Sequence, residues 1–383
     1  MTVNFINNEA ELISFCQQIS DTIWMTVDTE FLREKTYYPQ LCLIQVATED
    51  HIACIDPLAL SDLTPILDLI YSPEITVIFH AARQDLELLY LLRNSLPTNV
   101  FDTQIAATVL GYGDQIGYGN LVKQCLDVDL DKAHSRTDWT QRPLDPAQIE
   151  YAADDVRYLR DVYKLLLQQL EQKNRSHWLH EDFANLVDLN SYRIEPETMW
   201  RKIKGAGRLK GVQLATLQRL AAWREYRAVK SNRPRRWILK DDVLIDLARL
   251  APDSIEKFSM IRGLESGTID RHGKALLDEI KQAKALPKEQ WPTFKKTQPL
   301  TNQQDAIVDA LMALLRKYCD DQAIAPVAVA SRKDIERMVA GETDLPLQQG
   351  WRNEIVGHHL QAFLGGKLAI TADTTTLYTQ EKG

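Results

Sequence analysis

The pattern of strand-like and helix-like segments changes near Arg193, and this change limits the folds that the chain can adopt. Before about Leu170, four strand-like segments (22–31, 41–48, 51–57 and 75–80) combine with helical ones. The first three follow one another through short links, which predicts antiparallel pairing. Beyond Arg193 only helical patterns are found. The sequence therefore predicts an α/β domain with a mixed sheet, followed by small all-α domains.

The helical segments have recognisable ends. Residues 145–170 form one long helical pattern, with Asp145 at the N-cap and Pro146 at the first helical position. In the second half, Pro234 and Pro326 each precede an aspartate by eight residues and then an amphipathic helix. This weak internal repeat predicts a duplicated small helical domain. We expect domains at residues 1–193, 205–290 and 298–375, the last two joined by a Pro-rich linker at 286–300.

Charge is distributed unevenly along this 383-residue chain. Between Arg201 and Lys240 there are thirteen Lys or Arg and the single acid Glu225. This local charge of +12 leaves −20 for the rest of a chain whose net charge is −8. A basic module that holds a polyanion is one interpretation, with the interleaved tryptophans available to stack on bases. A solvated helical face with basic loops is the other.

Several protein classes are excluded by composition. A mean hydropathy of −0.29 and the absence of a long apolar run or leader-like N-terminus argue against a membrane or secreted protein, so we expect a cytoplasmic one. The cysteines are odd in number and lack C-x-x-C spacing, which predicts reduced core residues and no zinc site. They are Cys16, Cys42, Cys54, Cys125 and Cys319.

Asp28 and Glu30 stand two residues apart in the first strand-like segment. Side chains at i and i+2 of a strand point to the same face, so these two carboxylates lie side by side. Neighbouring carboxylates repel one another and lose hydration when buried, and they need a partner charge. A lone D-x-E pattern is also common where a strand ends in water, so a site needs further carboxylates.

Further acids follow later in the chain. Asp85 falls in the opening turns of a helix after the 75–80 strand, where the helix dipole favours negative charge. Tyr151 and Asp155 are spaced i, i+4 and share one face of the long helix, whereas Asp154 is rotated away by about 100°. Each signal alone also fits an ordinary helix with a solvated acid. Their combination in this chain order is more specific.

This combination resembles the DEDD 3′→5′ exonucleases of ribonuclease H-like fold, in their tyrosine subgroup, and most closely the ribonuclease D family. The resemblance is carried by VDTEFLREKTYYPQLCLIQVA, FHAARQDLELL, FDTQIAATVLGYG and TDWTQRPLDPAQIEYAADDVRYL. The histidine subgroup would place a histidine where Glu150 stands. The second half resembles two HRDC domains, the first through WREYRAVKSNRPRRWILKDDVLIDLA; the second departs from the usual pattern.

The resemblance implies a metal-dependent exoribonuclease. It assigns metal binding to Asp28, Glu30, Asp85 and Asp155, and catalysis to these acids together with Tyr151. Such a set of carboxylates suits two Mg²⁺ or Mn²⁺ ions, with one ion activating water and the other stabilising the leaving 3′ oxygen. Tyr151 is expected to position the attacking water, because a phenol of pKa about 10 is a poor base at neutral pH.

Substrate contacts are expected in two places. Around the acids, and in the loop before the long helix, we expect RNA contacts from Phe31, His80, Gln84, Lys132, Trp139 and Arg142. In the basic segment we expect them from Arg224, Arg227, Lys230, Arg233, Arg235 and Arg236. The expected partner is RNA with a free 3′ end, such as a tRNA precursor, trimmed to nucleoside 5′-monophosphates.

Two other functions remain open at this point. The same acids would serve a DNA 3′→5′ exonuclease for repair or proofreading, because the chemistry acts on the phosphate. A non-enzymatic nucleic-acid-binding scaffold is disfavoured, since all five site positions are filled. No G-x-x-x-x-G-K-[ST] loop is present, which argues against a helicase and against a nucleotide cofactor.

Overall fold

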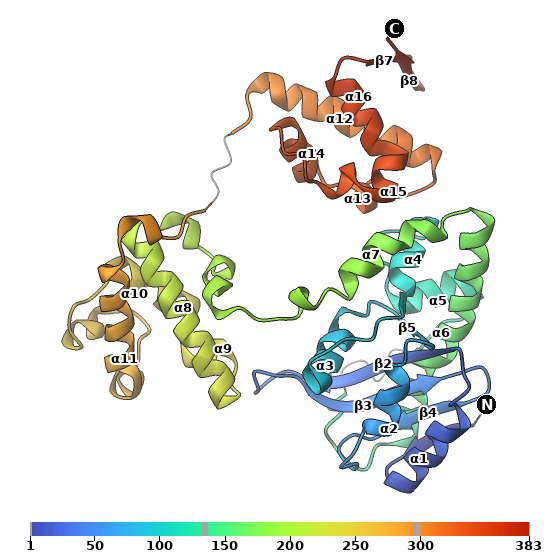
Figure 1. Cartoon of the computed structure of the whole chain (residues 1–383), viewed down its shortest axis with the longest axis horizontal. Helices are drawn as coiled ribbons and strands as arrows, with labels where there is room; N and C mark the ends of the chain where they lie inside the picture. Colours follow the sequence, from blue (N-terminus) through green and yellow to red (C-terminus); the bar gives the residue numbers. More distant parts are fainter. Residues whose placement is uncertain (1, 132–136, 295–298, 383) are drawn as a thin grey trace. The chain divides into compact units, whose positions relative to one another are not determined.

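The computed structural model describes residues 2–131, 137–294 and 299–382 (Figure 1). Contacts within the chain divide it into two compact units. The first, here called the sheet unit, comprises Met1–Glu30, Leu41–Tyr192 and Gln298–Gly383. The second, called the helical unit, comprises Phe31–Gln40 and Arg193–Thr297.

A six-stranded mixed sheet organises the sheet unit, with the strand order β1-β4-β3-β2-β5-β6. The pairs β1–β4, β2–β5 and β5–β6 are parallel, whereas β3 and β4 are antiparallel, as predicted. The edge strands β1 and β6 were not predicted, because segments this short show no clear periodicity. The strands are β1 (Val3–Ile6), β2 (Trp24–Leu32), β3 (Gln40–Ala47), β4 (Ile52–Ile55), β5 (Thr76–Phe79) and β6 (Val100–Asp102).

Helices cover both faces of this sheet. One hydrophobic core joins the sheet to α1, α2 and α3, and α6 crosses the other face with α4 and α5 packed against it. Buried side chains of β2 alternate accordingly, with Met25 and Val27 in the first core. The helices are α1 (Glu9–Gln18), α2 (Thr64–Ile70), α3 (Arg83–Arg93), α4 (Thr103–Leu110), α5 (Tyr118–Leu126), α6 (Pro146–Gln172) and α7 (Leu179–Leu186).

Helix α6 begins as predicted, with Asp145 at the N-cap and a reciprocal capping box to Gln148. Its middle is tied to the sheet by two polar contacts. The Thr26 hydroxyl donates to the carbonyl of Val156 at 3.0 Å, and buried Arg160 donates to the carbonyl of Thr48 at 3.2 Å. These bonds fix which face of α6 lies over the sheet.

The C-terminal segment shares a hydrophobic core with α4, α5, α6 and α7. The rings of Trp178 and Trp351 stack at 5.2 Å, and Arg352 forms an ion pair of 3.1 Å with Asp182. Its elements are α12 (Asn302–Asp321), α13 (Pro326–Val329), α14 (Arg332–Val339), α15 (Gly350–Arg352), the short π-helix Asn353–Gly357, α16 (His358–Leu364) and a hairpin of β7 (Leu368–Ala372) and β8 (Leu377–Glu381). The predicted segment 298–375 thus belongs to the same compact unit as the sheet, and the hairpin is an addition to its expected all-α content.

Gly111 lies where the backbone after α4 comes very close to the backbone after α12. Gly111 ends α4 with a φ of 93°, a conformation that favours glycine. A Cβ at this position would lie 2.2 Å from the carbonyl oxygen of Ala323, which follows α12. No side chain fits there, so the turn after α4 allows the C-terminal segment to pack directly on it.

The helical unit has a core of its own around Trp200, Leu217 and Phe258. The segment Phe31–Gln40 belongs to this unit: the side chain of Asn232 accepts hydrogen bonds from the backbone N–H groups of Tyr37 and Tyr38, at 3.1 and 3.2 Å. The helices are α8 (Val212–Ser231), α9 (Arg235–Ile238), α10 (Asp241–Leu250) and α11 (Ser266–Ala285).

The predicted internal repeat is visible in the structure. A 20-residue helix, a four-residue helix and an amphipathic helix follow one another both as α8, α9, α10 and as α12, α13, α14. In each copy two extended residues separate the last two helices: Leu239 and Lys240 in the first, Ala330 and Ser331 in the second. The two copies nevertheless lie in different units.

Candidate active site

Asp28 and Glu30 extend beyond the end of the neighbouring strand. Thr26 of β2 pairs with Ile78 of β5, which ends one residue later at Phe79, whereas β2 continues to Leu32. Since Thr26 hydrogen-bonds to α6, the alternation of a strand turns Asp28 and Glu30 toward the same face. The period-two argument from the sequence thus places both acids on the side of α6.

Asp85 lies in the first turn of α3 and is buried. Its carboxylate accepts a hydrogen bond of 2.5 Å from the Thr29 hydroxyl, which joins it to β2. The turn before α3 is held by Asp102, whose side chain accepts from the backbone N–H groups of Ala81 and Ala82 at 3.1 and 2.8 Å. Ala81 has a φ of 59°, and these two bonds stabilise that left-handed conformation.

Asp102 was not singled out from the sequence. From the sequence, Asp102 could be recognised only as an N-cap. Its side chain accepts from the N–H of Gln104 at 2.8 Å at the start of α4. Its second role, supporting the turn that leads to Asp85, depends on residues about twenty positions earlier. Such a pairing cannot be read from local pattern.

Helix α6 contributes Tyr151 and Asp155, while Asp154 is engaged elsewhere. Asp154 forms an ion pair with Arg157, which also contacts Glu150 at 2.6 Å. This arrangement agrees with the prediction that Asp154 is turned away from the other acids. Asp155 lies on the same face of α6 as Tyr151.

The four predicted metal ligands perturb one another. Burial, followed by repulsion from Asp28, Asp155 and Asp85, raises the pKa of Glu30 to about 9. Burial and then Asp28 raise the pKa of Asp155 to about 8. The pKa of Asp28 is raised to about 6 by burial, and that of Asp85 is raised well above its usual range by burial and Asp28. A positive side chain is not among the main causes for any of these four groups, so their repulsion is not offset.

Four hard oxygen donors with uncompensated charge fit a divalent cation such as Mg²⁺ or Mn²⁺. In the part of the chain that the structure describes, no group of three or more His, Cys, Asp or Glu side chains is already arranged to hold a metal ion.

The Tyr151 phenol stays protonated at neutral pH. Burial, then Asp155, Glu30 and Asp28, raise its pKa to about 12. Its ring stacks on that of Trp139, with a centroid distance of 6.4 Å and an interplanar angle of 29°. A protonated phenol donates a hydrogen bond rather than acting as a base, which agrees with the positioning role expected from the sequence.

Tyr118 is a further residue beside the acids that the sequence did not indicate. Burial, then Asp155 and Asp28, raise the pKa of its phenol well above the usual range, and its hydroxyl donates to the carbonyl of Asp154 at 2.9 Å. Its ring lies 5.5 Å from that of His80. In the sequence Tyr118 is simply the first residue of a helical pattern.

The expected RNA contacts near the acids fall into different environments. Both ring nitrogens of His80 are engaged at 3.0 Å, one with the Thr103 hydroxyl and the other with the carbonyl of Ile116. Gln84 is exposed in the first turn of α3, and Phe31 is half-buried in the helical unit. Lys132 lies outside the described residues.

Trp139 and Arg142 require a correction as RNA contacts. Trp139 is only 5% exposed, and its ring packs on Tyr151. The guanidinium of Arg142 forms an ion pair of 2.6 Å with buried Asp56 and also donates to three backbone carbonyls. Trp139 therefore has little surface for a substrate strand, and Arg142, whose side chain is 24% exposed, already uses its donors inside the domain.

Arg224 also needs correction, because its side chain is only 3% exposed and pairs with Asp241 at 2.7 Å. Arg235 is partly exposed and pairs with buried Glu225 at 3.2 Å. The charge run therefore divides into structural arginines and a solvent-facing remainder. The remaining predicted contacts are exposed or half-buried: Arg227, Lys230, Arg233 and Arg236.

A shallow hollow of about 510 Å³ adjoins this exposed basic surface. Trp237 at its rim is 60% exposed, and Lys204, Arg236 and Lys240 line it together with Asp241 and Asp242. An exposed indole among cations is the combination that holds single-stranded nucleic acid. This surface, defined by Lys204, Lys230, Arg233, Arg236, Trp237 and Lys240, is called the basic surface below.

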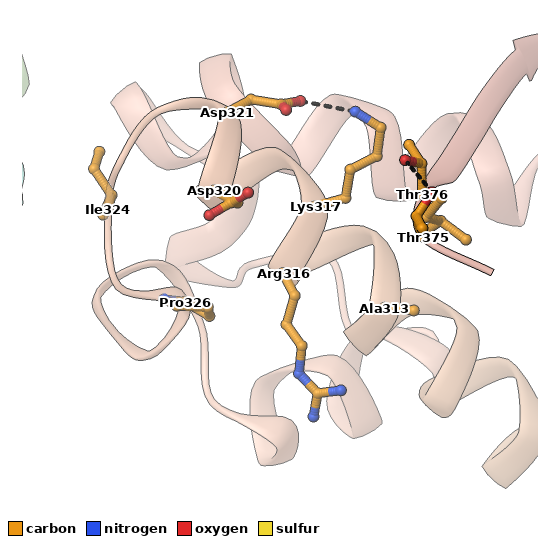
Figure 2. A pocket seen from close by; sticks show the side chains of 10 residues that line it. Ala313, Arg316, Lys317, Asp320, Asp321, Ile324, Pro326, Thr375 and Thr376 are labelled. Atoms are coloured by element: carbon orange, nitrogen blue, oxygen red, sulfur yellow. Dashed lines mark hydrogen bonds and ion pairs between the residues drawn. The ribbon is translucent and has the colours of Figure 1, made fainter. Parts of the chain in front are cut away.

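Another hollow, of about 710 Å³, lies between α12 and the turn of the β7–β8 hairpin (Figure 2). Lys317 pairs with Asp321 at 2.8 Å along its edge, and Arg316 and Asp320 also line it. Opposite charges alternate there, in contrast to the acids around Asp28. It therefore offers no comparable set of metal-binding carboxylates.

Among the described residues, no helix is both long enough and apolar enough to cross a membrane.

Comparison with known proteins identifies both parts of the chain. A 3′–5′ exonuclease family model matches residues 3–171, and an HRDC domain model matches residues 213–280. A ribonuclease D of Gluconacetobacter diazotrophicus is 39% identical over 373 residues, covering 97% of this chain and 95% of the relative. One of Acidiphilium cryptum is 39% identical over 370 residues, covering 96% and 94%.

The structural comparison agrees. The crystal structure of Escherichia coli RNase D, described as an exoribonuclease involved in structured RNA processing, superposes with a TM-score of 0.85 at 32% identity, covering 96% of this chain and 99% of that one. The predicted resemblance and fold class are therefore confirmed. This chain is a hydrolase, a 3′→5′ exoribonuclease that belongs to the ribonuclease D family.

Proposed function

We propose that this exoribonuclease trims the 3′ ends of RNA precursors such as tRNA, releasing nucleoside 5′-monophosphates one at a time. The observation that carries the proposal is the electrostatic coupling of buried Asp85 and half-buried Asp28, Glu30 and Asp155 beside Tyr151: Asp28 raises the pKa of each of the other three. Burying like charges is costly, and a fold that does so has a use for cations at that place.

The exonuclease family of this type depends on divalent metal ions. We assign their binding, as two Mg²⁺ or Mn²⁺ ions, to the four carboxylates. When bound, such ions supply a strongly nucleophilic water and stabilise the oxygen that leaves phosphorus. Asp28 is the central ligand in this assignment, because it contributes to the raised pKa of Glu30, Asp85 and Asp155 alike.

Tyr151 has a separate role in the proposal. Its phenol, with a pKa of about 12, holds its proton throughout the neutral range. It therefore donates a hydrogen bond to the attacking water or to a phosphate oxygen and orients that group toward phosphorus. Carboxylates of α6 and β2 that hold a cation would be ionised and could only accept hydrogen bonds, so they would not replace it.

The basic surface of the helical unit is assigned to the RNA upstream of the 3′ end. Its exposed lysines and arginines would contact phosphates, which gives affinity without sequence preference. Trp237 would stack on an unpaired base, and stacking of this kind tolerates any base. Structural arginines such as Arg224 support the surface from within.

The test replaces Asp28 by Asn in the full chain and follows 5′-labelled single-stranded RNA and DNA with Mg²⁺ or Mn²⁺. We expect hydrolysis to fall by at least about 100-fold, because a central oxygen ligand and its charge are lost. The folded state should persist, since a half-buried carboxylate is replaced by a neutral side chain of the same shape.

Asp154→Asn is the matched control, because Asp154 is the neighbour of Asp155 in sequence but pairs with Arg157. It should retain activity within about threefold of the wild type. Near-wild-type hydrolysis by the Asp28→Asn variant would refute the site. Preferential shortening of DNA, rather than a ladder from the 3′ end of RNA, would refute the proposed substrate.

A further inference from the structure

Arg142 uses all five of its N–H donors within the sheet unit. Nε and Nη2 donate to the two carboxylate oxygens of Asp56 at 2.6 and 2.7 Å. Nη2 also donates to the carbonyl of Cys42 in β3 at 2.7 Å. Nη1 donates to the carbonyls of Trp139 and Gln141, both at 2.8 Å. This side chain therefore joins the 139–142 turn to two strands of the sheet.

Asp56 is a rigid anchor for this fork. It follows β4 directly, is 2% exposed, and donates its backbone N–H to the carbonyl of Ile6 in β1 at 2.8 Å. Its carboxylate also accepts from the N–H of Leu58 at 3.0 Å. A buried carboxylate held by a bidentate guanidinium has one favourable geometry, so the position of Arg142 is well defined.

The same turn presents Trp139 to the candidate active site. Arg142 holds the carbonyl of Trp139, and the indole of Trp139 stacks on Tyr151 at 6.4 Å. The turn is closed by Asp138, whose side chain accepts from the N–H of Thr140 at 3.0 Å. Trp139 therefore forms a fixed wall beside the Tyr151 ring.

We propose that Arg142, fixed by Asp56, is a positioning residue that holds Trp139 against Tyr151 and thereby sets the place of the Tyr151 hydroxyl among the carboxylates. The inference rests on the proposed role of Tyr151 in orienting the reacting group. Without the Trp139 indole beside it, the Tyr151 ring could rotate about its side-chain bonds. A displacement of about 1 Å of a catalytic group can cost as much as 100-fold in rate.

The experiment compares Arg142→Lys and Trp139→Leu, each alone and combined with Tyr151→Phe. Lysine keeps a positive charge beside Asp56 but loses the planar fork that reaches Trp139 and Gln141. Leucine remains apolar but offers no ring to stack on Tyr151. The matched control is Arg93→Lys, because Arg93 also contacts a carboxylate, Asp68, and lies over a tyrosine ring, Tyr71, outside the site.

With Mg²⁺ and 5′-labelled single-stranded RNA, Arg142→Lys and Trp139→Leu should each lower kcat by about 10-fold or more and change KM by less than about twofold. Tyr151→Phe should lower kcat as well. In the Tyr151→Phe background, Arg142→Lys or Trp139→Leu should lower kcat by less than about a further twofold. The effects of residues that act as one unit on the activation free energy do not add. Arg93→Lys should leave both constants unchanged.

The outcomes separate this inference from the function on which it rests. If Tyr151→Phe leaves kcat unchanged, the proposed role of Tyr151 fails. Suppose instead that Tyr151→Phe lowers kcat and that Arg142→Lys or Trp139→Leu lowers kcat by the same factor in its presence as in its absence. These residues then act independently of Tyr151, and the positioning role is overturned. A rise in KM alone would make Arg142 an RNA contact and would also overturn it. Should Arg142→Lys fail to fold by circular dichroism, Trp139→Leu carries the same cycle.

Discussion

Two carboxyl side chains on one face of a strand destabilise a fold unless protons or cations offset their repulsion. Glu30 is the clearest case, because its pKa rises from 4.5 to about 9 through burial and through three neighbouring acids. It therefore binds a proton more tightly in the folded than in the unfolded chain. The site thus stores an electrostatic cost that a divalent cation would relieve.

The sign of the resulting pH dependence follows from linkage. Between about pH 4.5 and pH 9 the folded state of the metal-free chain holds the Glu30 proton and the unfolded state does not, so the free energy of unfolding falls as pH rises. One such group contributes at most about 1.4 kcal/mol per pH unit. Glu30→Gln should flatten this slope, and added Mg²⁺ should raise the stability of the wild type at about pH 8 but raise that of the variant less.

Denaturant unfolding of the metal-free protein at about pH 5 and about pH 8 measures this difference. Glu74→Gln is the control, because Glu74 is exposed in the turn before β5. An equal slope for wild type and the Glu30→Gln variant would show that Glu30 does not hold its proton in the folded state.

At this scale the sequence predicted the shared face of Asp28 and Glu30 and the shared face of Tyr151 and Asp155, because both follow from the local periods of strand and helix. The roles of Asp102 and Arg142 could not be predicted. Asp102 supports the backbone at Ala81, and Arg142 meets Asp56, some 86 residues away in the chain. Such partners are set by the tertiary fold and leave no local pattern.

Among the elements, α6 was predicted almost completely because it combines a long amphipathic pattern with a strong N-terminal signal. The edge strands β1 and β6 were missed because they are only four and three residues long. The run of basic residues in α8 and α9 identified the exposed cations only in part. Composition counts arginines, but it cannot distinguish Arg224, which is buried against Asp241, from exposed Arg236.

Helix α9 and the N-cap of α10 offer a test of the basic surface. Trp237→Ala should weaken binding of long single-stranded RNA by about 5- to 100-fold through loss of base stacking, with little change in salt dependence. Lys240→Gln should instead reduce the slope of log affinity against log salt by about one. Filter binding of RNA to the full chain over a range of salt concentrations measures both effects.

Met260→Ala is the control for both variants, because Met260 is 72% exposed in the same unit but lies outside the basic surface. Unchanged affinity and slope in both test variants would mean that the charge run is only a solvated face, the second interpretation that the sequence left open.

In the whole molecule, the order of segments along the chain was predicted better than their grouping. Two sets of helices follow the sheet domain in the expected order, and an HRDC model matches residues 213–280 of the first set. The second repeat shares a core with α4, α5, α6 and α7. Its tryptophan, Trp351, stacks on Trp178, which lies between α6 and α7. Sequence periodicity shows that a helix has an apolar face but does not identify the partner of that face.

The shared core has a consequence for folding. If residues 299–382 stabilise the sheet unit as its core implies, removing the Trp351 ring should destabilise both parts together. Trp351 is 3% exposed, stacks on Trp178 and donates to Asp182 at 3.2 Å, so Trp351→Ala should lower the free energy of unfolding by about 3–5 kcal/mol. Hydrogen exchange should then quicken in α4 and α6 as well as in α12, because one cooperative unit loses stability as a whole.

Trp237→Ala is the matched control for this change, since that tryptophan is 60% exposed and should leave the thermal midpoint unchanged. Faster exchange confined to residues 299–382 after Trp351→Ala would mean that the segment folds as an independent domain resting on the nuclease. Exchange that quickens in α4 and α6 would instead make the second helical repeat part of the scaffold that holds Tyr151 and Asp155, since both residues are carried by α6.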